Sequence, residues 1–185
     1  MTAIPYFALI ASALALLLAY YFAKTVMKAD EGTDLMKEIG QAIREGAMAF
    51  LRREYQWVSV FVAIMFVLLL VVPIEGRPSA SFAYLMGAVL SSIAGFIGMR
   101  IATAANTRTA NAAREGAAKA LPLAFKGGAV MGFTVAGLAL LGISFNYLLW
   151  VTWLGVDSAF QVVAAFGLGA SSIALFARIG GGIYT

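Results

Sequence analysis

The last part of the chain carries a single charged side chain. Arg178 is the only charged residue between Phe160 and Thr185, with Ala177 before it and three glycines at 180–182 after it. Small neighbours let other helices pack close to the guanidinium, which then needs an acidic partner and makes Arg178 a candidate functional residue. A simpler interpretation is an anchor whose guanidinium reaches the polar surface of a membrane.

Most other site chemistry is excluded by composition. Cysteine and histidine are absent, which excludes disulfides, Cys/His zinc sites, haem ligation by His and Ser-His or Cys-His nucleophile pairs. The acidic residues near the N-terminus alternate with Lys and Arg, as on a solvated helix face with ion pairs; they are Asp30, Glu31, Asp34, Glu38, Glu45 and Glu54. They lack the convergent carboxylates that Mg²⁺ requires. The sequence therefore predicts no catalytic, cofactor-binding or metal-binding residue in this chain.

The composition is that of a membrane protein. Of the 185 residues, 62% are hydrophobic and 12% are charged, whereas a soluble domain carries about 25% charge. Mean hydropathy is +0.90. An ordinary soluble globule and a disordered chain are both excluded.

Five uncharged runs organise the chain, at residues 4–23, 57–72, 82–99, 127–150 and 160–176. None of the 22 charged residues falls inside them. A helix needs about 20 apolar residues to cross the hydrocarbon core, and open strands cannot face lipid. The predicted fold is an all-α, polytopic transmembrane bundle with five spans, in one transmembrane domain over residues 1–185.

Two cytoplasmic extensions are predicted, at residues 34–56 and 100–120. Apolar residues recur at helical spacing after Asp34, and Thr33 or Asp34 can cap the helix start. One continuous helix from about 34 to 72 would be about 58 Å long, roughly twice the hydrocarbon thickness. The third span likewise continues into an alanine-rich stretch, which we expect Pro122 to break or kink.

Small residues recur every four positions on three of the spans. The stripes are Gly87, Ser91 and Gly95; Gly128, Gly132 and Ala136; and Ala165 and Gly169. Such stripes let transmembrane helices approach closely, so a packed bundle is predicted.

The basic residues predict orientation. Twelve of the thirteen Lys and Arg residues lie in segments 24–56 and 100–126 or at Arg178; Arg77 is the exception. The positive side faces the cytoplasm, so the N-terminus is predicted outside the cell membrane and residue 185 inside. No aromatic residues alternate with these basic residues to stack bases, which argues against nucleic-acid binding.

Four segments resemble one protein family. Residues 177–185, Ala-Arg-Ile-Gly-Gly-Gly-Ile-Tyr-Thr, look like the start of the signature of the membrane-integral, ion-translocating inorganic pyrophosphatases. Residues 36–51, 98–110 and 124–132 resemble the family's first cytoplasmic helix, the end of its third span and the start of its fourth, in that order.

The resemblance implies that the whole protein is larger than this chain. Family members are homodimers whose helices form an inner and an outer ring. They hydrolyse pyrophosphate with Mg²⁺ at the cytoplasmic face and export H⁺ or Na⁺, in some cases with dependence on K⁺. By this resemblance the fifth span belongs to the inner ring, and Arg178 lies near the ion gate, just below the hydrolytic centre.

The resemblance also implies that the catalytic residues follow directly after Thr185. The sequence stops inside an apolar, glycine-rich helix, so we expect a fragment that is inactive by itself. The alternative is a stand-alone five-span structural or channel-like protein without enzymatic activity, since composition and topology fit both interpretations.

Overall fold

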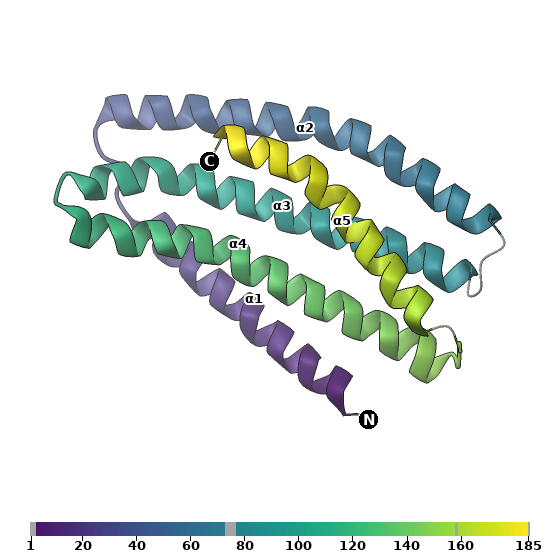
Figure 1. Cartoon of the computed structure of the whole chain (residues 1–185). Coiled ribbons are helices and arrows are strands. Elements are labelled where there is room, and N and C mark those ends of the chain that lie inside the picture. The colour runs from purple at the N-terminus through teal and green to yellow at the C-terminus, as the bar shows by residue number, and fades with distance from the viewer. Residues whose placement is uncertain (1–2, 73–76, 158, 185) are drawn as a thin grey trace.

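Long helices account for nearly all of the described chain. The computed structural model describes residues 3–72, 77–157 and 159–184. Its elements are α1 (Ile4–Lys28), α2 (Asp34–Val71), α3 (Arg77–Ala113), α4 (Ala117–Asn146), the π-helical segment η1 (Tyr147–Trp153) and α5 (Ala159–Tyr184) (Figure 1). No strand occurs among these residues.

Five helical stretches in the described residues are long and apolar enough to cross a membrane. One lies in each of α1, α2, α3 and α5, and the fourth in sequence runs from Ala117 to Trp153 through α4 and η1. The predicted all-α bundle with five spans is therefore confirmed.

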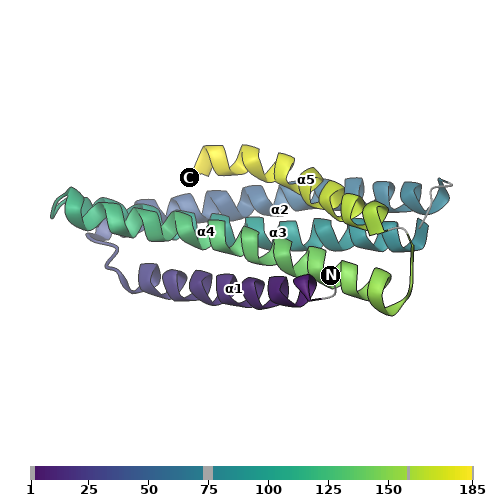
Figure 2. The ribbon, with the colours of Figure 1, turned by 60° about the horizontal axis from the view of Figure 1, so that its bottom comes forward.

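Three helices form a middle layer, with one helix on either face (Figure 2). α2, α3 and α4 lie side by side, α5 crosses α3 on one face and α1 packs on α4 on the other. The connections at residues 29–33 and 114–116 lie at one end of the bundle (Figure 1). The helices extend toward this end, where most of the basic residues also gather, and we call it the basic end.

α2 is one uninterrupted helix of 38 residues, as predicted. Thr33 caps its start, because its hydroxyl accepts a hydrogen bond from the backbone N–H of Met36 at 3.4 Å. This bond satisfies one of the four backbone donors that a helix start leaves unpaired. The first part of α2 therefore continues without a hinge into its membrane-spanning part.

The predicted extension over residues 100–120 is wrong about where the helix ends. α3 stops at Ala113, and α4 begins at Ala117 after a short turn. Gly116 provides this turn with φ 112°, a conformation that L side chains rarely adopt. Pro122 lies inside α4, in its second turn, and the helix continues past it to Asn146. The glycine breaks the helix, and the proline does not.

α3 and α5 approach closely at two glycines. A Cβ on Gly87 would overlap the carbonyl oxygen of Phe166, and a Cβ on Gly169 would overlap that of Tyr84. The contact is reciprocal, since each helix places a glycine against the other's backbone. The Ser91 hydroxyl adds a hydrogen bond across this seam to the carbonyl of Ala170 at 3.0 Å. The predicted small-residue packing of the third and fifth spans is confirmed.

The stripe predicted to pack on the fourth span, which contains Gly128 and Gly132, is wrong: it lies on an exposed face of α4. A Cβ added at Gly128 or Gly132 would meet no atom within 4 Å among the described residues. The glycines of α4 that pack are Gly127, against Ala105 of α3, Gly137, against Leu16 of α1, and Gly142, against the ring of Phe166. Several glycines on one helix can mark more than one face, and spacing alone does not choose between them.

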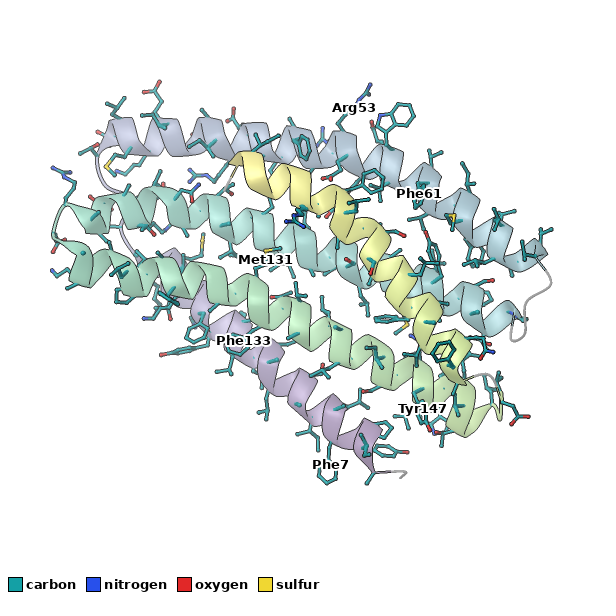
Figure 3. All side chains as sticks on the ribbon, in the orientation of Figure 1. Phe7, Arg53, Phe61, Met131, Phe133 and Tyr147 are labelled. Carbon is teal, nitrogen blue, oxygen red and sulfur yellow. The ribbon has the colours of Figure 1, made fainter. Side chains whose placement is uncertain are left out.

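Larger side chains close the remaining contacts. Phe133 lies between α4 and α1, with its ring centroid 5.9 Å from that of Phe22, and Phe61 of α2 stands 5.9 Å from Phe176 of α5 (Figure 3). The Tyr55 hydroxyl donates a hydrogen bond to the carbonyl of Ser92 on α3 at 2.6 Å. These contacts fix α1 against α4, and they fix α2 against α3 and α5.

Candidate functional site

Arg178 lies near the end of α5, at the rim of a cavity between α3, α4 and α5. The cavity measures about 300 Å³. The Arg178 side chain is exposed, and Ala177 beside it faces Gly95 of α3, where an added Cβ would lie 3.6 Å from the Ala177 Cβ. The small residue before Arg178 therefore lets α3 pass close to α5 at this level.

The rest of the cavity wall is almost entirely apolar. α3 contributes Gly87, Leu90, Ser91, Ala94 and Gly95, and α5 contributes Phe166, Ala170, Ala174 and Ala177. Ser91 already donates its hydroxyl proton to Ala170. Among the described residues that line the cavity, Arg178 is the only charged one, and an ionisable group beside an apolar wall is a candidate for pairing with an anionic partner.

The predicted acidic partner of Arg178 is not tested by these residues. Within the described part of the chain, the ion pairs join Lys37 to Asp34, Lys119 to Glu115, and two arginines to Glu31. None of them involves Arg178. Residues 180–182 continue α5, but the surroundings of these glycines lie outside what the structure describes.

A second charged site lies at the basic end and is buried. Arg108 of α3 is 6% exposed. Its Nη2 lies 2.8 Å from Glu31 Oε1, its Nε donates to the carbonyl of Ala29 at 3.1 Å, and its Nη1 donates to the carbonyl of Ala104 at 2.7 Å. All three guanidinium nitrogens are thus used. A buried cation needs such full pairing, because desolvation is costly.

The turn between α1 and α2 supplies the anionic half of this cluster. Glu31 is also 3.5 Å from Arg44 Nη1 of α2, and the amide of Asn111 reaches Asp30 Oδ2 at 3.4 Å. Gly32 has φ 92°, and a Cβ there would lie 2.8 Å from Asn111 Oδ1. The turn therefore fits tightly against α3. We call Glu31, Arg44 and Arg108 the ionic clamp, since they join the first turn to α2 and α3.

Sequence analysis missed the ionic clamp, because it assigned Glu31 to a solvated helix face. The exposed pairs Lys37–Asp34 and Lys119–Glu115 fit that assignment, with side-chain exposures of 51% or more, but Glu31 is 23% exposed. A signal was available in the alanine-rich stretch of α3. Arg108 is the only charged residue between Arg100 and Arg114, and a lone charge among small residues on a packed helix needs a partner.

The acidic residues do not form a metal site in the described part of the chain. No group of three or more Asp or Glu side chains lies close enough to hold an ion. The two carboxylates nearest to one another in sequence, Asp30 and Glu31, face Asn111 and the arginines of the ionic clamp. These residues do not fit Mg²⁺, and we assign it no ligand here.

Comparison with known families decides what the chain is. The sequence model of the inorganic H⁺ pyrophosphatases matches residues 13–185, which include both the ionic clamp and Arg178. The chain belongs to this family.

Individual relatives of the chain agree. It is 47% identical over 176 residues to a K⁺-insensitive pyrophosphate-energised proton pump of Methanosarcina mazei. It is 44% identical over 190 residues to a putative K⁺-stimulated pyrophosphate-energised sodium pump of Bacteroides thetaiotaomicron, and 43% identical over 179 residues to a protein of the same name from Clostridium tetani.

The matches cover nearly all of this chain but a small part of each relative. They include 95%, 95% and 97% of the chain, and 25%, 26% and 25% of the three relatives. The relatives named as proton pumps and as sodium pumps match this chain about equally well. The part of the family described here is therefore common to members named for either ion.

Proposed function

We propose that the chain is the N-terminal membrane segment of a pyrophosphate-energised ion pump. The whole protein would couple Mg²⁺-dependent hydrolysis of pyrophosphate at the cytoplasmic face to export of H⁺ or Na⁺, with K⁺ dependence in some members. The position of Arg178 carries this proposal most directly, because a lone exposed arginine at the end of an apolar, small-residue cavity suits an ion path better than a lipid-facing surface. The hydrolytic residues would lie beyond residue 185.

In this proposal Arg178 places a fixed positive charge in the ion path. A carboxylate from another helix of the whole protein would pair with it, and the guanidinium would stabilise that carboxylate and oppose leak of cations. Its planar, permanently charged fork suits a bidentate pair with a carboxylate, which an ammonium group cannot reproduce.

The proposed topology follows the basic residues. The basic end would face the cytoplasm, the N-terminus would lie outside, α1 to α4 would belong to an outer ring and α5 to an inner ring of a homodimeric protein. Cysteines at the exposed positions Asp157 and Ala117 report on this directly. Asp157→Cys should react with a membrane-impermeant reagent in whole cells, and Ala117→Cys should react only after permeabilisation; the reverse would overturn the orientation.

The deciding experiment uses the full-length protein in vesicles, with pyrophosphate hydrolysis and ion uptake measured with and without Na⁺ and K⁺. Arg178→Ala should abolish uptake, and Arg178→Lys should lower ion uptake per pyrophosphate hydrolysed. Arg100→Ala is the control, because Arg100 is an exposed arginine on α3. Normal pumping by Arg178→Ala at normal expression would instead support an anchoring role for Arg178.

Two further outcomes bear on the alternative function. Residues 1–185 by themselves should not hydrolyse pyrophosphate, and Mg²⁺-dependent hydrolysis by them would show that the hydrolytic residues were misplaced. Failure of the full-length protein to hydrolyse pyrophosphate would favour a structural or channel-like five-span protein.

A further inference from the structure

α2 carries two adjacent arginines at the level where its apolar part begins. No charged residue occurs from Tyr55 to Val71, a stretch that rises about 26 Å along a helix axis. The hydrocarbon core of a bilayer is about 30 Å thick. If this stretch spans the core, Arg52 and Arg53 stand at the headgroup layer on the side of the basic end.

The three charged residues at this level do not neutralise each other. Arg52 and Arg53 are exposed, whereas Glu54 is partly buried and its Oε2 is fully enclosed by the bundle. Within the described residues, neither arginine makes an ion pair. The next acidic residue back along α2, Glu45, lies about two turns away and accepts a hydrogen bond from Gln41 at 2.9 Å. The outer surface of α2 therefore presents two guanidinium groups without a compensating anion.

An exposed tryptophan lies one turn further into the apolar part. Trp57 is 66% exposed and follows Arg53 by four residues, so both occupy the same outer face of the helix. Figure 3 shows Arg53 pointing away from all other helices. Further along the same face, Val60 and Ile64 are 54% and 60% exposed. Charge, an interfacial aromatic ring and an apolar strip thus follow one another along α2.

We propose that Arg52, Arg53 and Trp57 form a binding site for the headgroup of an anionic phospholipid of the surrounding bilayer. Guanidinium groups bind phosphate oxygens through charge-assisted, often bidentate hydrogen bonds, and tryptophan favours the level of the headgroups. The acyl chains would lie along Val60 and Ile64. The unbalanced charge selects an anionic lipid over a zwitterionic one, and the apolar strip selects a lipid over a free phosphate.

The test places brominated lipids next to Trp57 in the full-length protein. Vesicles contain phosphatidylcholine and phosphatidylglycerol, with bromine on the acyl chains of one or the other, and tryptophan emission is measured. Subtracting the emission of Trp57→Phe isolates the Trp57 signal, and its quenching reports the local lipid composition. We expect phosphatidylglycerol to be enriched beside Trp57 about fivefold or more over the bulk mixture, since each basic residue near an anionic surface contributes about fivefold.

The variants assign the preference to the two arginines. Arg52→Gln with Arg53→Gln should bring the enrichment close to one, and Arg52→Lys with Arg53→Lys should keep most of it. Arg114→Gln removes the same charge beyond the end of α3, about 20 Å from Arg100 along the helix and thus more than two Debye lengths from the bilayer at physiological ionic strength. It should leave the enrichment unchanged.

Three results would overturn the proposal. These are equal quenching by the two brominated lipids in the wild type, unchanged enrichment in the double Gln variant, and the absence of quenching by either lipid. The last result would mean that protein rather than lipid covers this face of α2. Inorganic phosphate at millimolar concentration should not displace the lipid, and displacement would identify a phosphate site without lipid selectivity.

Discussion

The seam between α3 and α5 and the ionic clamp at the basic end join helices by opposite means. At the seam, Gly87 and Gly169 remove side chains so that two backbones touch. At the clamp, Arg108 and Glu31 use long charged side chains to reach one another across 2.8 Å. The seam contains no charged side chain, whereas the clamp consists mainly of charged side chains.

The difference follows from the solvent around each region. In lipid there is little hydrophobic drive to bring helices together, so close packing of small residues and hydrogen bonds take over that role. At the basic end, which we propose to lie outside the bilayer, water is nearby, and an ion pair with hydrogen bonds to backbone carbonyls can be completed at moderate cost. Mutations at the seam should therefore act through steric overlap, and mutations at the clamp through unpaired charge.

The largest effect should come from Gly169→Leu at the seam. Its Cβ would overlap the carbonyl oxygen of Tyr84, and because backbone cannot move aside as a side chain does, we expect a loss of about 3 kcal/mol or more. Thermal unfolding of the full-length protein in mild detergent measures it. Gly167→Leu, at a position where no described residue lies within 4 Å of an added Cβ, should cost less. Equal unfolding temperatures for the two variants would refute the close contact.

Arg108→Met should come second. It leaves Glu31 with Arg44 alone at 3.5 Å and removes the bonds to Ala29 and Ala104. Breaking a buried pair costs about 3 kcal/mol or more, and we expect about 2 kcal/mol because Glu31 is partly exposed. The double variant Arg108→Met with Glu31→Met should recover part of the loss, and Arg114→Met should have no effect. No recovery in the double variant would argue against pairing with Glu31.

Tyr55→Phe tests an interhelical contact that is polar but uncharged, and so differs from both the seam and the clamp. It removes one hydroxyl that donates to Ser92 at 2.6 Å and leaves the ring in place. We expect a loss of about 1 kcal/mol, the usual net value of one such hydrogen bond. Ser59→Ala is a suitable control, since its hydroxyl bonds only within α2, to the carbonyl of Tyr55. An equal loss from both variants would contradict an interhelical role.

Lys37→Met should show no measurable effect, although Lys37 Nζ lies 3.2 Å from Asp34 Oδ1. Both side chains are largely exposed, and water and salt weaken such pairs. Unfolding curves at low and high salt should coincide for wild type and variant. A clear shift at low salt would mean that exposed and buried ion pairs of this protein differ less than the comparison implies.

Much of the fold was predictable because lipid constrains sequence strongly. Uninterrupted apolar runs set the five spans, the cap at Thr33 marked the start of α2, and small residues on two spans marked the seam at Gly87 and Gly169. These features depend on neighbours in sequence or on a simple period. Which glycine face of α4 packs depends on where α1 and α5 lie, which no local pattern records.

The candidate site divides in the same way. Arg178 was evident as an isolated charge and the structure places it at a cavity wall, while its role and its partner both stay predictions. The ionic clamp was not predicted, because Glu31 lies in a turn and meets Arg108 only through tertiary structure. The break at Gly116 was missed because Pro122 is the stronger helix breaker in general, yet α4 continues through Pro122.

Because α2 is one unbroken helix, a tilt at one of its ends also displaces the other end. With Arg53 at the headgroup layer, as proposed above, residues 34–53 would extend about 30 Å past it, close to the length of the stretch that would cross the bilayer. A tilt of about 5° with its pivot at Arg53 would therefore swing the outer tip by about 3 Å one way and the buried end by a similar distance the other way. The ionic clamp holds that tip to α3 and to the first turn. The tip of α2, the end of α3 and the first turn would therefore move together, and a small rotation of α2 inside the bilayer would displace them by about the same distance outside it.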